Sequence, residues 1–184
     1  MLIPPTYNPP SVTPPDQPRK TGLVGGTIGA FDLFHVGHLR FLAAARQHCT
    51  HLKVGVGSDR LLPLSKGRAP VCSESHRMEI LRGLRCVDEV CVFDVGLDRT
   101  DAAARWLADW GVSTVFVSRD WINTPRWQHL MPMLAHQGIA CHALPYTQGI
   151  STTALRQQLT QGGQKAQQDT SLADVVSPGR VKMV

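Results

Sequence analysis

The sequence predicts a Rossmann-like, doubly wound α/β fold: five parallel strands in one sheet with helices on both faces. Three observations favour this fold. Short apolar stretches of strand length alternate with longer stretches whose apolar residues recur at helical spacing. Glycine-bearing turns follow the first and the last of the apolar stretches. With 184 residues, 42% of them hydrophobic and 18% charged, the chain is long enough to bury the core of one domain.

Each expected element follows from a local pattern. Strands are expected where short apolar runs stand between turn residues, and helices where apolar residues recur three or four positions apart. Ser73 and Ser75 can cap one helix, and Asp101 can cap the next. The expected strands are 23–28, 51–57, 89–93, 114–117 and 139–144. The expected helices are 37–47, 73–84, 102–109 and 127–136, with a last helix that starts at Ser151.

Composition divides the chain into three parts. Residues 1–21 are rich in proline, which excludes a helix or a central strand there. We expect an extended or disordered arm, with a linker or tag as the alternative. Residues 161–184 are rich in Gln, Ser and Gly and lose the apolar period, which is typical of a flexible tail. The folded domain is therefore expected at 22–160.

Charge and cysteine content exclude several classes of protein. The net charge is +5, but the basic residues are scattered, which favours a small anionic ligand over nucleic acid. No stretch approaches the ~20 apolar residues of a membrane span, and no signal peptide is recognisable. Five dispersed cysteines without a CxxC pair indicate reduced thiols. We therefore expect a cytoplasmic protein without a membrane or nucleic-acid partner.

The turn after the first expected strand carries the strongest chemical signal. His35 and His38 stand three residues apart at the start of a helix, so their rings lie on one face. Gly37 between them allows close approach of the backbone, and the first helical N–H groups add positive potential. These groups together suit phosphate oxygens. The alternatives are a zinc pair, which would need further ligands, and surface histidines without a role.

Two further segments suit anionic ligands. Ser151, Thr152 and Thr153 place three hydroxyls at the start of the last helix, where they bind phosphate or act only as caps. Lys66 and Arg68 flank a glycine in the loop expected after the second strand. Two cations in such a loop can close over phosphates or simply remain solvated.

Longer runs around these residues resemble a known family. The first turn, Gly29-Ala30-Phe31-Asp32-Leu33-Phe34-His35-Val36-Gly37-His38, resembles the GTFDxxHxGH signature of the cytidylyltransferase-like nucleotidyltransferases, with Ala30 in place of the usual Thr. The run 146–153 resembles their second signature, (R/Y)TxGISTT, with Tyr146 where glycerol-3-phosphate cytidylyltransferases usually have Arg. Segments 75–77, 85–90 and 118–121 resemble the EHR, RxVDEV and GDDW or GSDW segments of those enzymes, and the resemblance covers about residues 22–160.

The resemblance implies a reaction. It is closest to the glycerol-3-phosphate cytidylyltransferases, which implies transfer of CMP from CTP to a small phosphorylated acceptor such as glycerol 3-phosphate, with release of pyrophosphate. Alternatives are an adenylyltransferase that uses ATP on a sugar phosphate, FMN or pantetheine phosphate, and a nucleotide-binding protein without activity. The resemblance also implies Mg²⁺ bound through the nucleotide phosphates, with no metal site on the protein, and a homodimer.

The resemblance also assigns roles to particular residues. His35, His38 and Lys66 are expected to be catalytic. Arg77 and Arg85 are expected to bind the acceptor phosphate, because eight residues are about two helical turns and place both on one face. The expected nucleotide-binding residues are Ala30, Phe31, Asp32, Gly37, Arg68, Asp120, Trp121, Tyr146, Gly149, Ile150, Ser151, Thr152 and Thr153.

Overall fold

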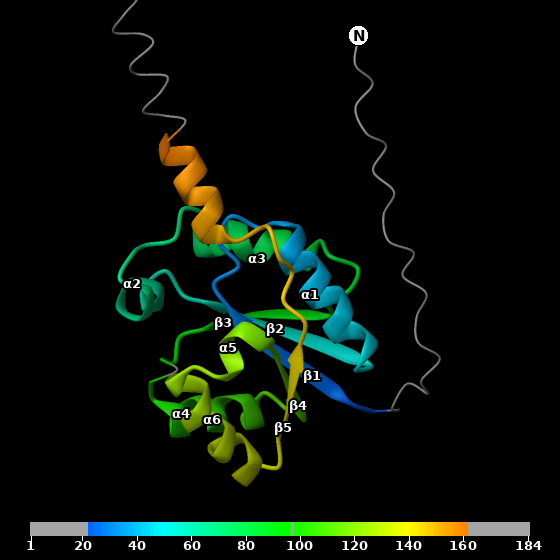
Figure 1. Ribbon diagram of the computed structural model, residues 1–184. Coiled ribbons are helices and arrows are strands. Elements are labelled where there is room, and N and C mark those ends of the chain that lie inside the picture. The colour runs from blue at the N-terminus through cyan, green and yellow to red at the C-terminus, as the bar shows by residue number, and fades with distance from the viewer. Residues whose placement is uncertain (1–21, 97, 162–184) are drawn as a thin grey trace, which may run out of the picture.

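A computed structural model describes residues 22–96 and 98–161, and in that part the predicted fold class is confirmed (Figure 1). Five parallel strands form one sheet of order β3-β2-β1-β4-β5. The strands are β1 (Val24–Gly29), β2 (His51–Gly57), β3 (Glu89–Phe93), β4 (Thr114–Ser118) and β5 (Ala140–Leu144). The predicted arm, 1–21, and all but the first residue of the predicted tail lie outside the described residues.

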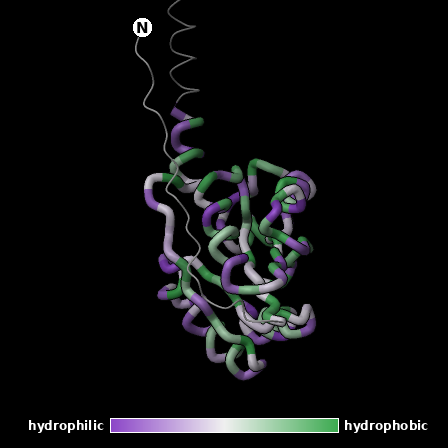
Figure 2. The backbone as a smooth tube through the Cα atoms, turned by 90° about the vertical axis from the view of Figure 1, so that its right-hand side faces the viewer, coloured by the Kyte–Doolittle hydropathy of each residue, from purple (hydrophilic) through white to green (hydrophobic). Residues whose placement is uncertain are grey.

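Helices follow the strands in sequence and cover the sheet. They are α1 (Val36–Gln47), α2 (Leu61–Lys66), α3 (Glu74–Arg82), α4 (Thr100–Asp109), α5 (Arg119–Ile122) and α6 (Pro125–His136). Residues 152–161 form a further helix, which stands out from the body of the molecule and carries both hydrophilic and hydrophobic residues (Figure 2). No helix among the described residues is long and apolar enough to cross a bilayer.

Two apolar cores lie on the two faces of the sheet. One contains Leu42 of α1 and Leu81 of α3 packed on the sheet, and the other contains Leu107 of α4 and Leu130 of α6. Because both faces are covered, most residues of the central strands β1, β2 and β4 are buried. β1 lies close to its neighbours: a Cβ atom on Gly25 would lie 2.4 Å from the Phe116 ring, so only glycine fits there.

The strand order reverses beside β1. The chain starts at the centre, runs outward through β2 and β3, and returns to β4 and β5 on the other side. The loops after β1 and β4 therefore leave the sheet toward opposite faces, and a crevice opens between them at the carboxyl ends of the strands. This topology places the predicted turn with His35 and His38 beside the crevice.

Two short helices were not predicted. α2 spans six residues that were expected to be loop, and Lys66 is its last residue. α5 spans four residues just after β4 and contains Asp120 and Trp121. Neither segment is long enough for a helical period to show in the sequence. Gly67 ends α2 in the left-handed conformation, with φ of 68°.

Two of the helix boundaries that differ from the prediction change the role expected of a residue. α4 begins at Thr100, so Asp101 lies in its first turn and pairs with Arg105 at 2.6 Å instead of capping the helix. α3 ends at Arg82, capped at its start by Ser73 as expected. Arg85 therefore lies beyond the helix, and the prediction that it shares a helical face with Arg77 is wrong.

Candidate active site

A cavity of about 460 Å³ opens at the carboxyl ends of β1 and β4. Its walls come from the turn after β1, from α2, from the segment around α5 and the start of α6, and from residues 145–156. Segments near both ends of the described chain thus meet at one site. Of the predicted site residues, fifteen line it: Ala30, Phe31, Asp32, His35, Gly37, His38, Lys66, Arg68, Asp120, Trp121, Tyr146, Ile150, Ser151, Thr152 and Thr153.

His35 and His38 stack on each other at the start of α1. Their ring centroids are 3.9 Å apart and the planes differ by 20°. His35 caps the helix, because its Nδ1 accepts a hydrogen bond from the Gly37 N–H at 3.1 Å. The neutral His35 ring therefore carries its proton on Nε2, where it can donate to a ligand. A Cβ atom at Gly37 would lie 2.8 Å from this ring, which explains the glycine.

Both histidines are held in the neutral form. Burial lowers the pKa of His38 to about 4, helped by the charge of His35 and opposed by that of Asp32. Burial also lowers the pKa of His35. The buried Nδ1 of His38 has no hydrogen-bond partner among the described residues. A buried polar atom of this kind costs free energy until a ligand supplies a partner.

The backbone between β1 and α1 has an unusual conformation. Phe31 and Leu33 have φ of 50° and 47°, in the left-handed region that residues with a side chain seldom adopt. The Phe31 ring is buried and meets His38 edge-on, with centroids 5.4 Å apart. Surrounding contacts must therefore hold this turn in place.

Asp32 supplies those contacts. Its buried carboxylate accepts hydrogen bonds from the N–H groups of Val71 and Cys72 and from Arg156 at 2.5 Å, and its carbonyl accepts from the Thr152 hydroxyl at 3.0 Å. Burial alone would raise the pKa of Asp32, but the hydrogen bonds and the Arg156 charge outweigh it and lower the pKa. We call these five residues the Asp32 clasp. It joins the turn after β1 to residues 120 positions further along the chain.

Sequence reasoning missed Arg156. Its guanidinium lines the cavity, binds Asp32 and donates to the Ala69 carbonyl at 3.0 Å, while its buried Nε has no partner among the described residues. The sequence feature that could have identified Arg156 is its spacing from Thr152. Arg156 follows Thr152 by four residues, so the two share a face of the last described helix.

The hydroxyls at the start of the last helix have different partners within the protein. Ser151 Oγ accepts from the Ala154 N–H at 3.1 Å, so this hydroxyl acts as a cap. Thr153 accepts from Arg68 at 3.3 Å on the cavity wall. Tyr146 donates to the Ile150 carbonyl at 3.2 Å, and Gly149 takes a φ of 82° in the turn between them without lining the cavity itself.

Lys66 closes another side of the cavity. Its ammonium lies 4.0 Å from the centroid of the Trp121 ring, a cation–π contact between α2 and α5. Partial burial of the ammonium lowers the Lys66 pKa, and the charges of Arg126 and Arg68 lower it further. Arg126 also lines the cavity and was missed by the sequence analysis.

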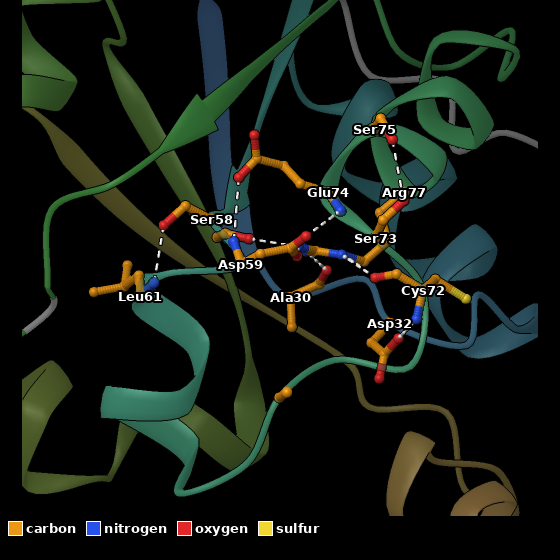
Figure 3. A network of polar contacts seen from close by, with 12 residues as sticks. Ala30, Asp32, Ser58, Asp59, Leu61, Cys72, Ser73, Glu74, Ser75 and Arg77 are labelled. Carbon is orange, nitrogen blue, oxygen red and sulfur yellow. Dashed lines mark hydrogen bonds and ion pairs between the residues drawn. The ribbon is translucent and has the colours of Figure 1, made fainter.

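The predicted acceptor-binding arginines lie elsewhere. Arg77 is completely buried and donates to the carbonyls of Ala30, Gly57 and Cys72, with an ion pair to Asp59 at 2.7 Å (Figure 3). Arg85 is exposed beyond the end of α3, and neither arginine lines the cavity. The guanidinium of Arg77 instead holds together the ends of β1 and β2.

The fold and the cavity define a Rossmann-like α/β protein with a ligand crevice at the switch point of its sheet. The chain belongs to the cytidylyltransferase-like family, whose model matches residues 27–158.

Curated relatives match a shorter part of the chain. The bifunctional protein HldE of Hyphomonas neptunium is 42% identical over 78 residues, which are 41% of this chain and 16% of that protein. HldE of Bradyrhizobium sp. is 46% identical over 77 residues, which are again 41% of this chain and 16% of that protein. The chain thus spans about a sixth of the length of these relatives.

Solved structures share the fold at low identity. A lipopolysaccharide core biosynthesis protein from Thermoplasma volcanium has a TM-score of 0.55 and 19% identity, covering 68% of this chain and 96% of that one. TmcAL from Thermotoga maritima, solved with alpha-thio ATP, has a TM-score of 0.57 and 16% identity, covering 76% and 51%.

Proposed function

We propose that the protein is a nucleotidyltransferase that moves CMP from CTP to a small phosphorylated acceptor, glycerol 3-phosphate or a similar polyol phosphate. One observation carries the proposal: the stacked pair His35 and His38 and the hydroxyl-bearing start of the last helix line the same cavity. Membership of the cytidylyltransferase-like family supports the reaction type. The choice of CTP and a polyol phosphate rests on the resemblance of segments 85–90, 118–121 and 146–153 to the glycerol-3-phosphate cytidylyltransferases.

The reaction requires positioning and charge stabilisation. An oxygen of the acceptor phosphate attacks the α-phosphorus of the nucleotide, and the bond from that phosphorus to the bridging oxygen of the β-phosphate breaks. Pyrophosphate leaves with the bonding electrons, and no covalent enzyme intermediate forms. The protein must therefore bind several phosphates at once and stabilise the charge that develops between them.

The cavity residues can share this task. His35 donates from Nε2 to oxygens of the α-phosphate, and the His38 ring, which lines the cavity beside it, donates a second hydrogen bond to them. Thr153 and Arg68 bind the outer phosphates from the side of the last helix, and Lys66 neutralises charge from α2. The neutral state of both histidines suits donation of a hydrogen bond at pH 7.

Magnesium enters the proposal with the nucleotide. Among the described residues no group of three or more His, Cys, Asp or Glu side chains could hold a metal ion, and Asp32 is occupied by the clasp. A Mg²⁺ bound by triphosphate oxygens and water would neutralise phosphate charge. We assign no protein ligand to it.

ATP is the second candidate nucleotide. The curated relatives named above are HldE proteins, and their 42–46% identity gives no support to CTP over ATP. A pyrophosphate-release assay that crosses CTP and ATP with glycerol 3-phosphate, sugar phosphates and FMN tests the proposal. Release with CTP and a polyol phosphate is expected. Pyrophosphate release with ATP alone would show that ATP, and not CTP, is the substrate. Nucleotide binding without pyrophosphate release would show that the protein binds nucleotides but is not an enzyme of this type.

Replacement of His38 tests the mechanism. We expect His38→Ala to lower turnover about 10²- to 10³-fold, the usual cost of one transition-state donor, while the fold is kept. His136→Ala is the matched control, because this histidine is exposed at the end of α6 and does not line the cavity. Turnover should be measured for each variant, and circular dichroism should be recorded to check that the fold is kept. Parent-like turnover of His38→Ala with every acceptor would contradict the mechanism.

A further inference from the structure

The proposed reaction needs a cationic group for the acceptor. The acceptor phosphate must approach a triphosphate that is itself strongly negative, so its own charge must be neutralised beside the α-phosphate. Arg77 is buried behind the cavity and Arg85 lies away from it, as described above. Other cations must serve if the proposed function holds.

Arg126 at the start of α6 has the features of such a group. Its side chain is half-buried and lines the cavity. Within the described residues it makes no hydrogen bond or ion pair, in contrast to Arg68 and Arg156 on the same cavity. A guanidinium held in a cavity without an anion is well placed to bind one, with two donors directed at one phosphate.

The groups around Arg126 also favour binding of an anion there. Arg126 is close enough to Lys66 for its charge to lower the Lys66 pKa, so two cations face the same space. The N-terminus of α6 has no side-chain cap, because the Thr124 hydroxyl donates to the Trp121 carbonyl instead. Free N–H groups of this first turn, which includes Arg126 and Trp127, add positive potential where both residues line the cavity.

The charges around the cavity are unbalanced. Four cationic side chains and two carboxylates of the described residues line it. Asp32 is neutralised by Arg156, and Asp120 accepts a hydrogen bond from Ser118. Arg68 reaches toward Thr153 on the proposed triphosphate side. Lys66 and Arg126 are left without an acidic partner, so their side of the cavity can take a further dianion.

We propose that the phosphate group of the acceptor binds between Lys66 and Arg126, at the uncapped start of α6. The proposal rests on the proposed function and assigns the acceptor site to α2 and α6. Arg126 is then the residue that selects acceptors with a phosphate over neutral polyols. The Trp121 ring, which holds Lys66 by its cation–π contact, is a positioning residue for this site.

Steady-state kinetics with a matched pair of variants tests the proposal. Arg126→Gln should raise the KM for glycerol 3-phosphate about 10- to 100-fold and leave the KM for the nucleotide within about twofold. Arg126→Lys should recover part of the loss. Arg119→Gln, which removes the same charge from α5 at an exposed position off the cavity, should change neither KM. An equal rise in both KM values, or an unchanged acceptor KM, would overturn the proposal.

A binding measurement separates this proposal from the proposed function. Isothermal titration of glycerol 3-phosphate and of inorganic phosphate into the parent and both Gln variants needs no turnover. Binding by the parent and by Arg119→Gln, with at least tenfold weaker binding by Arg126→Gln, supports the site even if no pyrophosphate is released. Absence of binding by the parent, or unchanged binding by Arg126→Gln, overturns it. Thermal unfolding of each variant checks that the fold is intact.

Discussion

His38 shows how one side chain can link ligand binding to stability. Its ring is packed against Phe31 and His35, and its pKa falls to about 4 through burial. In the unfolded chain the same ring titrates near 6.5. Below that pH the unfolded chain binds a proton that the folded protein does not accept. Acid therefore favours unfolding until the pH approaches 4.

This difference in the His38 pKa predicts that the unfolding free energy of the ligand-free protein falls as the pH is lowered. Between pH 7.5 and 5.0 the parent should lose about 2 kcal/mol of unfolding free energy through His38, and His38→Asn should lack that loss. The exposed His136 serves as control, since His136→Asn should keep the acid sensitivity of the parent. Urea unfolding at both pH values measures the effect. Identical losses in the parent and in His38→Asn would show that the ring titrates normally.

At the residue scale, the sequence predicted contacts between near neighbours in the chain but not contacts between distant residues. The spacing of His35 and His38 predicted that their rings lie together, and the rings do stack, although His35 precedes α1 as its N-cap. The pairing of Asp32 with Arg156 could not be predicted, since it joins residues 124 positions apart. Arg77 was misread for the same reason: a charged side chain suggests a ligand until its buried carbonyl partners are known.

At the level of elements, length decides what a sequence reveals. β2 and β3 have the predicted bounds, because apolar residues alternate along β2 and run together in β3. α2 and α5 are short, so the period that identifies a helix cannot develop in them. These two helices hold Lys66 and Trp121 against each other. The part of the site that the sequence placed least well is thus the part built on the shortest elements.

The Asp32 clasp should contribute to the unfolding free energy, because it joins the turn after β1 to the 71–72 loop and to the last described helix. Asp32→Asn should lower the unfolding free energy by about 1–3 kcal/mol, because Arg156 and the N–H groups of the 71–72 loop lose a buried carboxylate. Asp101→Asn is the control, since its ion pair with Arg105 is solvent-exposed and its loss should change the unfolding free energy much less than the loss of the Asp32 carboxylate. Chemical denaturation of both variants measures the difference. Equal small losses would mean that the clasp contributes little.

At the scale of the whole molecule, the parallel sheet was the easiest feature to predict, and the contact between the two ends of the described chain was the hardest. Alternating elements predicted the parallel sheet, and a switch point follows from the doubly wound topology. The sequence did not show that the last described helix would bind the turn after β1 through Asp32. The homodimer implied by the family resemblance stays a prediction.

Nucleotide binding should therefore stabilise both ends of the domain together. At a nucleotide concentration 100 times its Kd, the unfolding free energy should rise by about 2.7 kcal/mol. Hydrogen exchange should slow in 30–38 and in 150–156 at the same nucleotide concentrations, because the proposed ligand contacts both. Thermal unfolding and exchange measured with CTP, ATP and phosphate alone test this. Protection confined to one of the two segments would contradict a shared phosphate site.

The order in which the site is assembled has a consequence for synthesis. The wall with His35 and His38 is translated early, but the partners of Asp32 in the last described helix, Thr152 and Arg156, come more than a hundred residues later. A nascent chain still tethered to the ribosome can form β1 to β4 and yet lack one wall of the crevice. In the proposed function, nucleotide binding during synthesis therefore requires that residue 156 has left the exit tunnel.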